Sequence, residues 1–205
     1  MHSRKQTLAC SRTVHSSTVK QINMIKTKII IVTSITLLIL NIPSLFAQEE
    51  KFVNDFVERL ENSQKYLNLV AEMMPEEKYD YKVTPESLSF AENLMHIGYA
   101  LDWHSQSLLG GREARTWHTD TIYKTHNKNK KEMLVVINNT FEKAITLLKD
   151  FDTAQLDDKL DYFGLDRSKR QIFMLLADHI THHRGQMLIH LRFNGLVPPR
   201  YVLYQ

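Results

Sequence analysis

The sequence has 205 residues, a formal net charge of +3 and one cysteine. The charge is unevenly distributed: residues 1–47 carry six basic groups and no acidic group, whereas the remaining 158 residues carry 20 basic and 23 acidic groups, a net charge of −3. A slightly acidic body argues against the broad basic surface with which proteins bind nucleic acid. Its length suits one domain with a full hydrophobic core.

The N-terminal stretch has the pattern of a signal peptide. Lys26 and Lys28 precede an apolar run over residues 29–40, and small-to-medium residues then lead to Ala47, with Leu45 larger than the small residue usual two positions before the last residue of a signal peptide. This order of basic, apolar and cleavage-like regions predicts export of the protein to the periplasm or the exterior. An uncleaved membrane anchor is the alternative, but the run is shorter than the roughly 20 residues that span a bilayer.

Met24 fits the start of this signal peptide better than Met1 does. We therefore divide the sequence into an upstream extension (1–23), a signal peptide (24–47) and one mature domain (48–205). The single cysteine, Cys10, lies in the extension. The mature domain can therefore form neither a disulfide nor a thiolate site, and a metal ion in it must be bound by nitrogen and oxygen ligands.

Four stretches of the mature domain repeat apolar residues with a helical period, and together they predict an all-α four-helix bundle. Their limits are set by helix-start and helix-stop residues: Thr84 as an N-cap before Pro85, Ser168 as an N-cap, and Gly110 and Gly195 as stops. The predicted helices cover residues 52–74, 85–109, 129–151 and 168–193.

The connections at 110–127 and 152–165 lack a helical period, and we predict both to be loops, with no strand of useful length. The first is long for a small helical domain, which is typical of a segment that crosses the bundle end or covers a site.

The fourth helix carries the most informative pattern in the chain. Ile172, Leu176, His179, His183 and Met187 are spaced by 4, 3, 4 and 4 residues, so they share one apolar helix face. His179 and His183 lie one turn apart and can bind a single ion. A pair of buried, hydrogen-bonded histidines is the alternative, but two adjacent imidazoles would leave nitrogens without partners unless something bridges them.

A complete metal site needs a ligand from another helix, and His96, in the middle of the second helix, is the best candidate. His104 is the next choice, at the end of the same helix. His182 could replace His183 geometrically, but it lies on a more polar edge with Asp178 and Gln186. The remaining histidines have simpler explanations: we expect His118 and His126 to be solvated in a loop and His190 to lie at the edge of the core.

The histidine segment and its upstream partner resemble those of a known family. The run from His179 through His183-Arg184-Gly185-Gln186, followed by residues 191–195 and Pro198-Pro199, is similar to the C-terminal signature of the DinB/YfiT-like metal-binding superfamily. Upstream, residues 84–86, 89–90 and 94–97 resemble the segment that carries this family's first ligand. The resemblance covers roughly residues 50–200.

The resemblance implies a four-helix bundle with a three-histidine site for a divalent ion, Ni²⁺ or Zn²⁺, formed by His96, His179 and His183. Arg184 and Gln186 match the motif as well, and we assign them supporting or packing roles. We expect Gly185 to allow close approach of another helix.

Three neutral histidines leave a coordination position for water, whose pKa would fall, or for a substrate thiolate or carbonyl. The first hypothesis is therefore a metal-dependent enzyme of hydrolase or thiol-transferase type that acts on a small molecule. Glu92, one turn before His96, is a weak candidate for its base, and Asp178 is another; a plain surface acid is the better explanation of each.

A non-catalytic metal-binding bundle, acting in stress or in protein interactions, is the second hypothesis. A haem bundle is a distant third, because no haem-attachment motif is present. Bundles of this kind often form homodimers, although the sequence does not identify the face. A membrane partner is expected only through an uncleaved signal segment.

Overall fold

The computed structural model describes residues 3–201, with side chains described for residues 23–34 and 47–201. Residues 1–2 of the predicted extension, and the side chains of residues 35–46 in the predicted signal peptide, lie outside this set. The chain divides into two compact units, Met1–Gln48 and Glu49–Gln205. The boundary lies one residue from the predicted start of the mature domain.

Helix α1 is assigned over Ser3–Met73, and its residues 49–73 belong to the second unit. In the first unit, the described apolar side chains at positions 24, 25 and 29–32 are exposed. Within the described part of the chain, no helix combines the length and apolarity needed to cross a membrane.

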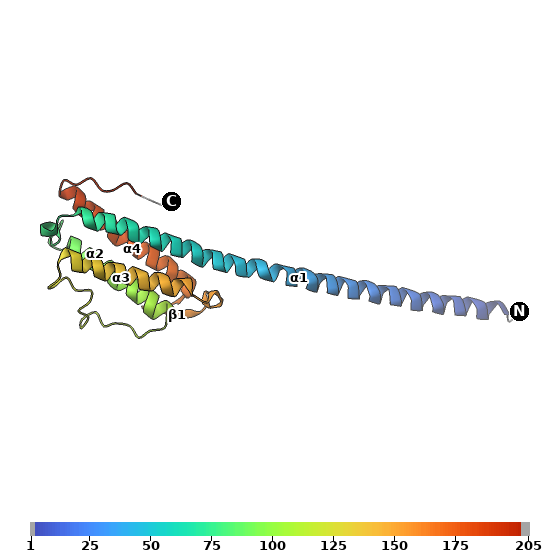
Figure 1. Ribbon diagram of the computed structural model, residues 1–205. Coiled ribbons are helices and arrows are strands. Elements are labelled where there is room, and N and C mark those ends of the chain that lie inside the picture. The colour runs from blue at the N-terminus through green and yellow to red at the C-terminus, as the bar shows by residue number, and fades with distance from the viewer. Residues whose placement is uncertain (1–2, 202–205) are drawn as a thin grey trace. The chain divides into compact units, whose positions relative to one another are not determined.

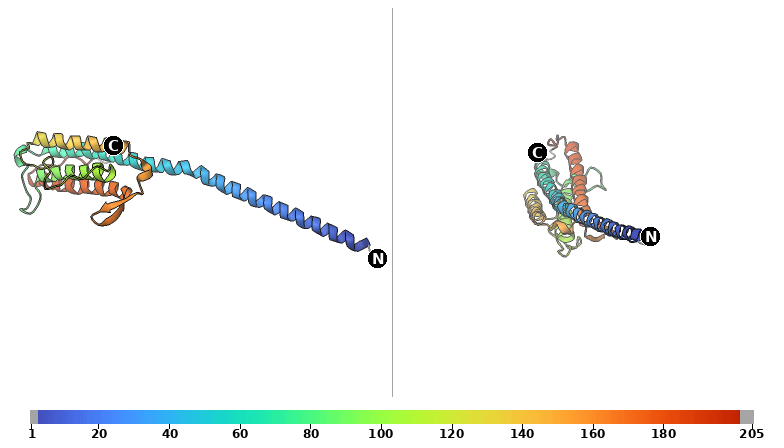
Figure 2. Two further views of the ribbon diagram at one scale, coloured as in Figure 1. Left: turned by 90° about the horizontal axis from the view of Figure 1, so that it is seen from below. Right: turned by 90° about the vertical axis from the view of Figure 1, so that its right-hand side faces the viewer.

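The second unit is mostly helical, and its helices surround one core (Figures 1 and 2). Fully buried side chains come from all four long helices, among them Leu67, Leu94, Phe141 and Phe173. After α1 the elements are a 3₁₀ turn (Glu76–Lys78), α2 (Phe90–Asp102), a π-helical segment (Trp103–Leu109), α3 (Lys130–Lys149), a 3₁₀ turn (Thr153–Gln155), β1 (Lys159–Tyr162), β2 (Leu165–Ser168) and α4 (Lys169–Phe193).

Each of the helices α2, α3 and α4 begins with a capping box, in which a side chain at the N-cap and one three residues later satisfy each other's backbone amides. Ser168 starts α4 as predicted, and α3 starts next to its predicted position. The predicted start of α2 was wrong. Ser89 and Glu92 form its capping box, whereas Thr84 forms a hydrogen-bonded turn with Ser87, so residues 84–88 precede the helix.

The expectation of no strand was also wrong, because residues 159–168 form an antiparallel hairpin that pairs Tyr162 with Leu165. Its two-residue turn, Phe163-Gly164, has positive φ angles of 55° and 78°. Positive φ at both positions matches the right-handed twist of the flanking strands. Gly164 was the only local sign of this turn in the sequence.

Gly185 does not have the packing role that we expected. A Cβ atom at this exposed position would meet no atom within 4 Å. The close approach occurs at Gly98 of α2, where a Cβ would lie 2.7 Å from Cδ1 of Ile137 on α3 and 3.0 Å from the Tyr123 ring. Gly98 therefore lets α3 and the loop before it pack directly against the helix that carries His96.

Candidate metal centre

Three histidines from two helices meet at one point inside the second unit. His96 comes from α2, and His179 and His183 come from successive turns of α4. One nitrogen of each ring lies within 4.8 Å of the others. The ring centroids are 5.0 Å apart for His96 and His179, 4.5 Å for His96 and His183, and 4.7 Å for the pair on α4. The structure thus brings together the three residues that the sequence singled out.

His179 Nε2 is buried and has no hydrogen-bond partner. An unpaired buried polar atom costs roughly 1–3 kcal/mol, and such atoms are rare in native proteins. This nitrogen faces a cluster of imidazoles, none of which supplies it with a hydrogen bond. A metal ion between the rings would satisfy it.

The cluster favours neutral imidazoles, because burial lowers the pKa of all three rings. The pKa of His179 falls to about 4, through burial and then through the charges of His96, His104 and His182. The pKa of His183 falls to about 3, through burial and then through His96, His179 and His182. The pKa of His96 is lowered by burial and by His182. At neutral pH each ring therefore carries an unprotonated nitrogen, as metal binding requires.

Asn93 selects the tautomer of His183, and sequence reasoning missed this residue. Its Nδ2 donates to the carbonyl oxygens of Leu88 and Ser89, which can only accept, so its Oδ1 faces His183 Nδ1 at 2.9 Å. His183 Nδ1 must then carry the proton, which leaves the Nε2 lone pair free for a ligand. The available signal was a buried asparagine three residues before His96, on the same apolar helix.

These features fit a divalent ion with nitrogen ligands. Metal–imidazole distances are about 2.0–2.1 Å, so the nitrogens need only a modest rotation of the rings to close on one ion. The donor set contains no sulfur and no carboxylate. Residues His96, His179 and His183 would hold the ion, and Asn93 would orient one of them.

The other histidines that we considered lie outside the cluster. His104 is buried, and both of its nitrogens are engaged: Nδ1 donates to Ala100 O at 2.7 Å, so Nε2 accepts from the Tyr162 hydroxyl at 3.1 Å. His190 is also buried, between the carbonyl oxygens of Gln186 and Leu88. His118 and His126 are exposed, as predicted, and His182, which the sequence placed on a more polar edge, is exposed as well.

The two further residues of the motif have different surroundings. Arg184 is buried against α1, with its guanidinium 5.2 Å from the ring centre of Tyr66 and 5.5 Å from that of Tyr201. Gln186 contacts the exposed His182. Both arrangements are consistent with packing or surface roles.

Glu92 faces the neighbouring pocket, but it already has two partners. One of its oxygens accepts hydrogen bonds from the Ser89 amide at 2.7 Å and lies 3.1 Å from Lys82 Nζ. Burial raises the pKa of Glu92, but these hydrogen bonds outweigh burial, so the pKa lies below its usual value. A carboxylate held in its charged form is a weak proton acceptor, which fits a capping role better than that of a base.

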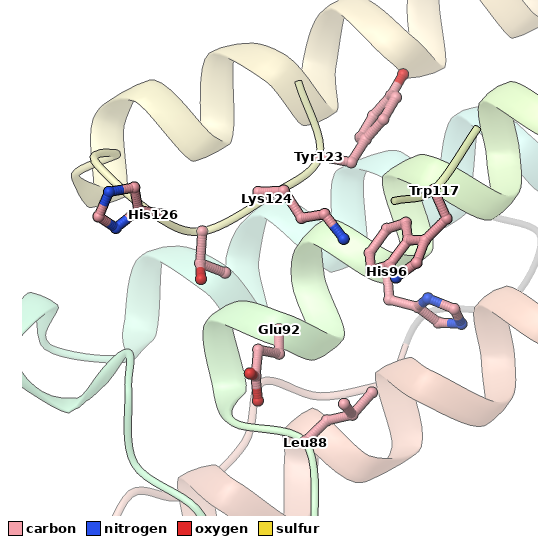
Figure 3. A pocket seen from close by; sticks show the side chains of 8 residues that line it. Leu88, Glu92, His96, Trp117, Tyr123, Lys124 and His126 are labelled. Atoms are coloured by element: carbon pink, nitrogen blue, oxygen red, sulfur yellow. The ribbon is translucent and has the colours of Figure 1, made fainter. Parts of the chain in front are cut away.

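A pocket of about 300 Å³ opens beside His96 (Figure 3). Its lining is mainly apolar and comes from the start of α2 and from the loop before α3. The lining residues are Leu88, Glu92, His96, Trp117, Tyr123, Lys124, Thr125 and His126. The pocket would give a small molecule access to one side of the histidine cluster.

The loop over this pocket is fixed by ion pairs and aromatic contacts. Asp102, the buried last residue of α2, pairs with Arg112 and Arg115. Asp120 accepts hydrogen bonds from two backbone amides of the loop and pairs with Arg115 at 3.3 Å. Tyr99 packs on Trp117 with ring centres 4.6 Å apart. Trp117 is thereby held against His96, at a ring distance of 6.1 Å.

Helices around one core, with a half-buried three-histidine cluster beside a pocket, define a class of helical bundle proteins with a candidate metal centre. Residues 48–204 match the model of the DinB family, and the chain belongs to that family. This agrees with the resemblance found in the sequence.

Two Bacillus proteins are similar to the chain. The uncharacterized protein YjoA of Bacillus subtilis (strain 168) is 22% identical over 145 residues, which cover 69% of this chain and 90% of YjoA. The crystal structure of YjoA, a DinB-like protein, gives a TM-score of 0.55 at 23% identity, covering 76% of this chain and 97% of that structure. A DinB-like protein from Bacillus cereus ATCC 10987 gives 0.58 at 21% identity, with coverages of 74% and 95%. At these identities the two structures establish the fold.

Proposed function

We propose that this DinB family protein is an exported enzyme that uses a divalent ion, Ni²⁺ or Zn²⁺, to transform a small molecule by hydrolysis or by thiol transfer. The single observation that carries the proposal is the buried, unpaired Nε2 of His179 between two further neutral histidines. When bound, the ion would supply Lewis-acid chemistry at a coordination position that the three histidines leave open.

The surroundings of the cluster favour an enzyme over a non-catalytic metal-binding bundle. Structural metal sites are closed by protein ligands, whereas catalytic sites keep one side accessible. Here His96 belongs both to the cluster and to the wall of a pocket. The cluster lies on rigid helices, and a loop fixed by Asp102 and Asp120 covers it in part.

The chain's own residues would perform three tasks. Asn93 would keep the proton of His183 on Nδ1, so that Nε2 stays available. Trp117 would shield the side of His96 that faces the pocket. Leu88 and Tyr123 would contact the apolar part of the substrate.

Export rests on the sequence of residues 24–47, with its basic start, its apolar run and its cleavage-like end at Ala47. N-terminal sequencing of the protein recovered from its natural source would test this part. A mature chain that begins near Gln48 supports export, whereas a chain that retains residues 24–47 contradicts a cleaved signal.

The test of the enzyme proposal has two steps. Metal analysis of the purified protein should give close to one Ni²⁺ or Zn²⁺ per chain, and the ion should be lost in His183→Ala and kept in His182→Ala. The loaded protein is then assayed on a panel of esters, amides and thiol-acceptor pairs. Metal-dependent turnover that His96→Ala abolishes supports an enzyme; bound metal without turnover on any member favours the non-catalytic bundle.

A further inference from the structure

Lys124 is the one lysine that lines the pocket, and its surroundings differ from those of its neighbours. Its ammonium lies 3.4 Å from the ring centre of Trp117. Figure 3 shows this side chain directed along the pocket toward Trp117 and His96. Among the described residues, no carboxylate forms an ion pair with Lys124 and no hydrogen-bond acceptor contacts its ammonium.

The next lysines along the chain have backbone partners instead. Lys128 donates to the carbonyl oxygens of Thr121 and Lys124, and Lys130 donates to those of Glu72 and Met74. Both therefore fasten the loop and the start of α3. The ammonium of Lys124 fastens no backbone in this way, and an ammonium on a half-buried lysine favours an anionic partner.

The rest of the lining restricts the nature of that partner. Leu88, Trp117 and Tyr123 provide an apolar wall, and the volume of about 300 Å³ fits only a small molecule. Glu92 also faces the pocket as a charged group, paired with Lys82. A dianion such as a phosphate ester would need more donors than one ammonium and would be repelled by Glu92 about twice as strongly as a monoanion, which needs only a single charge-assisted contact.

We propose that the pocket binds a small organic carboxylate, with the carboxylate on Lys124 Nζ and the apolar body between Leu88 and Trp117. This inference rests on the proposed function only in naming the substrate class of the same site. The cation–π contact with Trp117 holds the ammonium in place before the ligand arrives.

Phenylacetate and its neutral analogue phenylacetamide are suitable probes, because they share one shape and differ in charge. Their binding to metal-free and to metal-loaded protein is measured by calorimetry and by Trp117 fluorescence, with Trp103→Phe removing the other tryptophan. Phenylacetate should bind the metal-free protein about tenfold or more tightly than phenylacetamide, as expected for one charge-assisted hydrogen bond.

Lys124→Met should remove this preference, and Lys124→Arg should restore most of it. Lys131→Met, which removes an exposed lysine on α3, is the matched control and should leave it unchanged. Thermal unfolding of each variant checks that the fold is intact. Equal binding of the two probes by the wild type, or an unchanged preference in a folded Lys124→Met variant, would overturn the proposal.

The readout in metal-free protein separates this proposal from the proposed function. If the wild type binds no metal but prefers phenylacetate through Lys124, the enzyme proposal fails and the carboxylate site stands. If metal binds and the preference is absent, the carboxylate site fails and the metal centre stands.

Discussion

Two neighbouring regions of the second unit, one around His104 and one around His179, differ in the hydrogen bonding of these two histidines. In the π-helical segment after α2, His104 has a partner for each nitrogen, the Ala100 carbonyl and the Tyr162 hydroxyl. Its ring centre is only 6.0 Å from that of His179, whose Nε2 has no partner. Burial lowers the pKa of both rings. The comparison shows that burial of a histidine does not by itself identify a metal ligand. A buried ring nitrogen without a hydrogen-bond partner, close to other imidazoles, is the more specific sign.

The largest expected effect is on metal binding. Replacing His179 by alanine removes one of three ligands, so the affinity for Zn²⁺ or Ni²⁺ should fall by at least about 100-fold. His104→Gln should change it little, because His104 already has protein partners. Competition with a chromophoric chelator measures both affinities. An equal loss of metal affinity in the two variants would show that the two regions do not differ in metal binding.

A smaller effect should appear on metal affinity when the partner of His183 is removed. Asn93→Ala removes the acceptor of the proton on His183 Nδ1, so the ring is no longer held in the tautomer that leaves Nε2 free. Metal binding should weaken by about 10–100-fold. Asn138→Ala is the matched control, since Asn138 is an asparagine that joins α1 to α3 through Gln64 and Asn68. It should lower stability and leave the affinity unchanged. The same chelator titration applies, and an unaffected affinity in Asn93→Ala would remove its orienting role.

The two regions should also differ in the stability of the metal-free protein. His104→Leu leaves the Tyr162 hydroxyl without its acceptor and should lower the free energy of unfolding by about 1–3 kcal/mol. His179→Leu removes an atom that already lacks a partner, so the change should stay within about 1 kcal/mol. Urea unfolding of both variants after chelation gives the comparison. A larger loss in His179→Leu would mean that His179 has a structural role of its own.

The smallest effect should be that of mild acid on metal affinity. Because the pKa values of His179 and His183 fall to about 4 and 3, protons compete with the ion at these two rings only near and below that range, and burial lowers the pKa of His96 as well. Between pH 7.5 and 5.5 the affinity should change by less than about tenfold, whereas three unperturbed histidines would cost roughly a factor of 1000. Calorimetric titrations across this range decide between the two, and a thousandfold loss would contradict neutral, buried ligands.

The apolar periodicity allowed most of the fold and the choice of histidines to be predicted. The steps between Ile172, His179 and His183 placed two rings on one buried face, and the position of His96 in the middle of a helix supplied the third. Such patterns reflect which side chains face the core, and the spacing of apolar residues in a single sequence reveals this reliably.

The errors share a different cause, competition among local interactions. Two plausible N-caps precede α2, and the reciprocal bonds of Ser89 and Glu92 prevailed over Thr84-Pro85. The hairpin at 159–168 depends on a turn with positive φ at Phe163, which sequence pattern does not reveal. Asn93 was missed because its role exists only when α4 lies beside α2.

Anomalous diffraction from crystals of the protein loaded with Zn²⁺ or Ni²⁺ would test the metal centre most directly. We predict one peak per chain, with a nitrogen of His96, of His179 and of His183 each about 2.0–2.2 Å away. A strong peak bound by other residues, or no peak in protein that has been saturated with metal, would contradict the account.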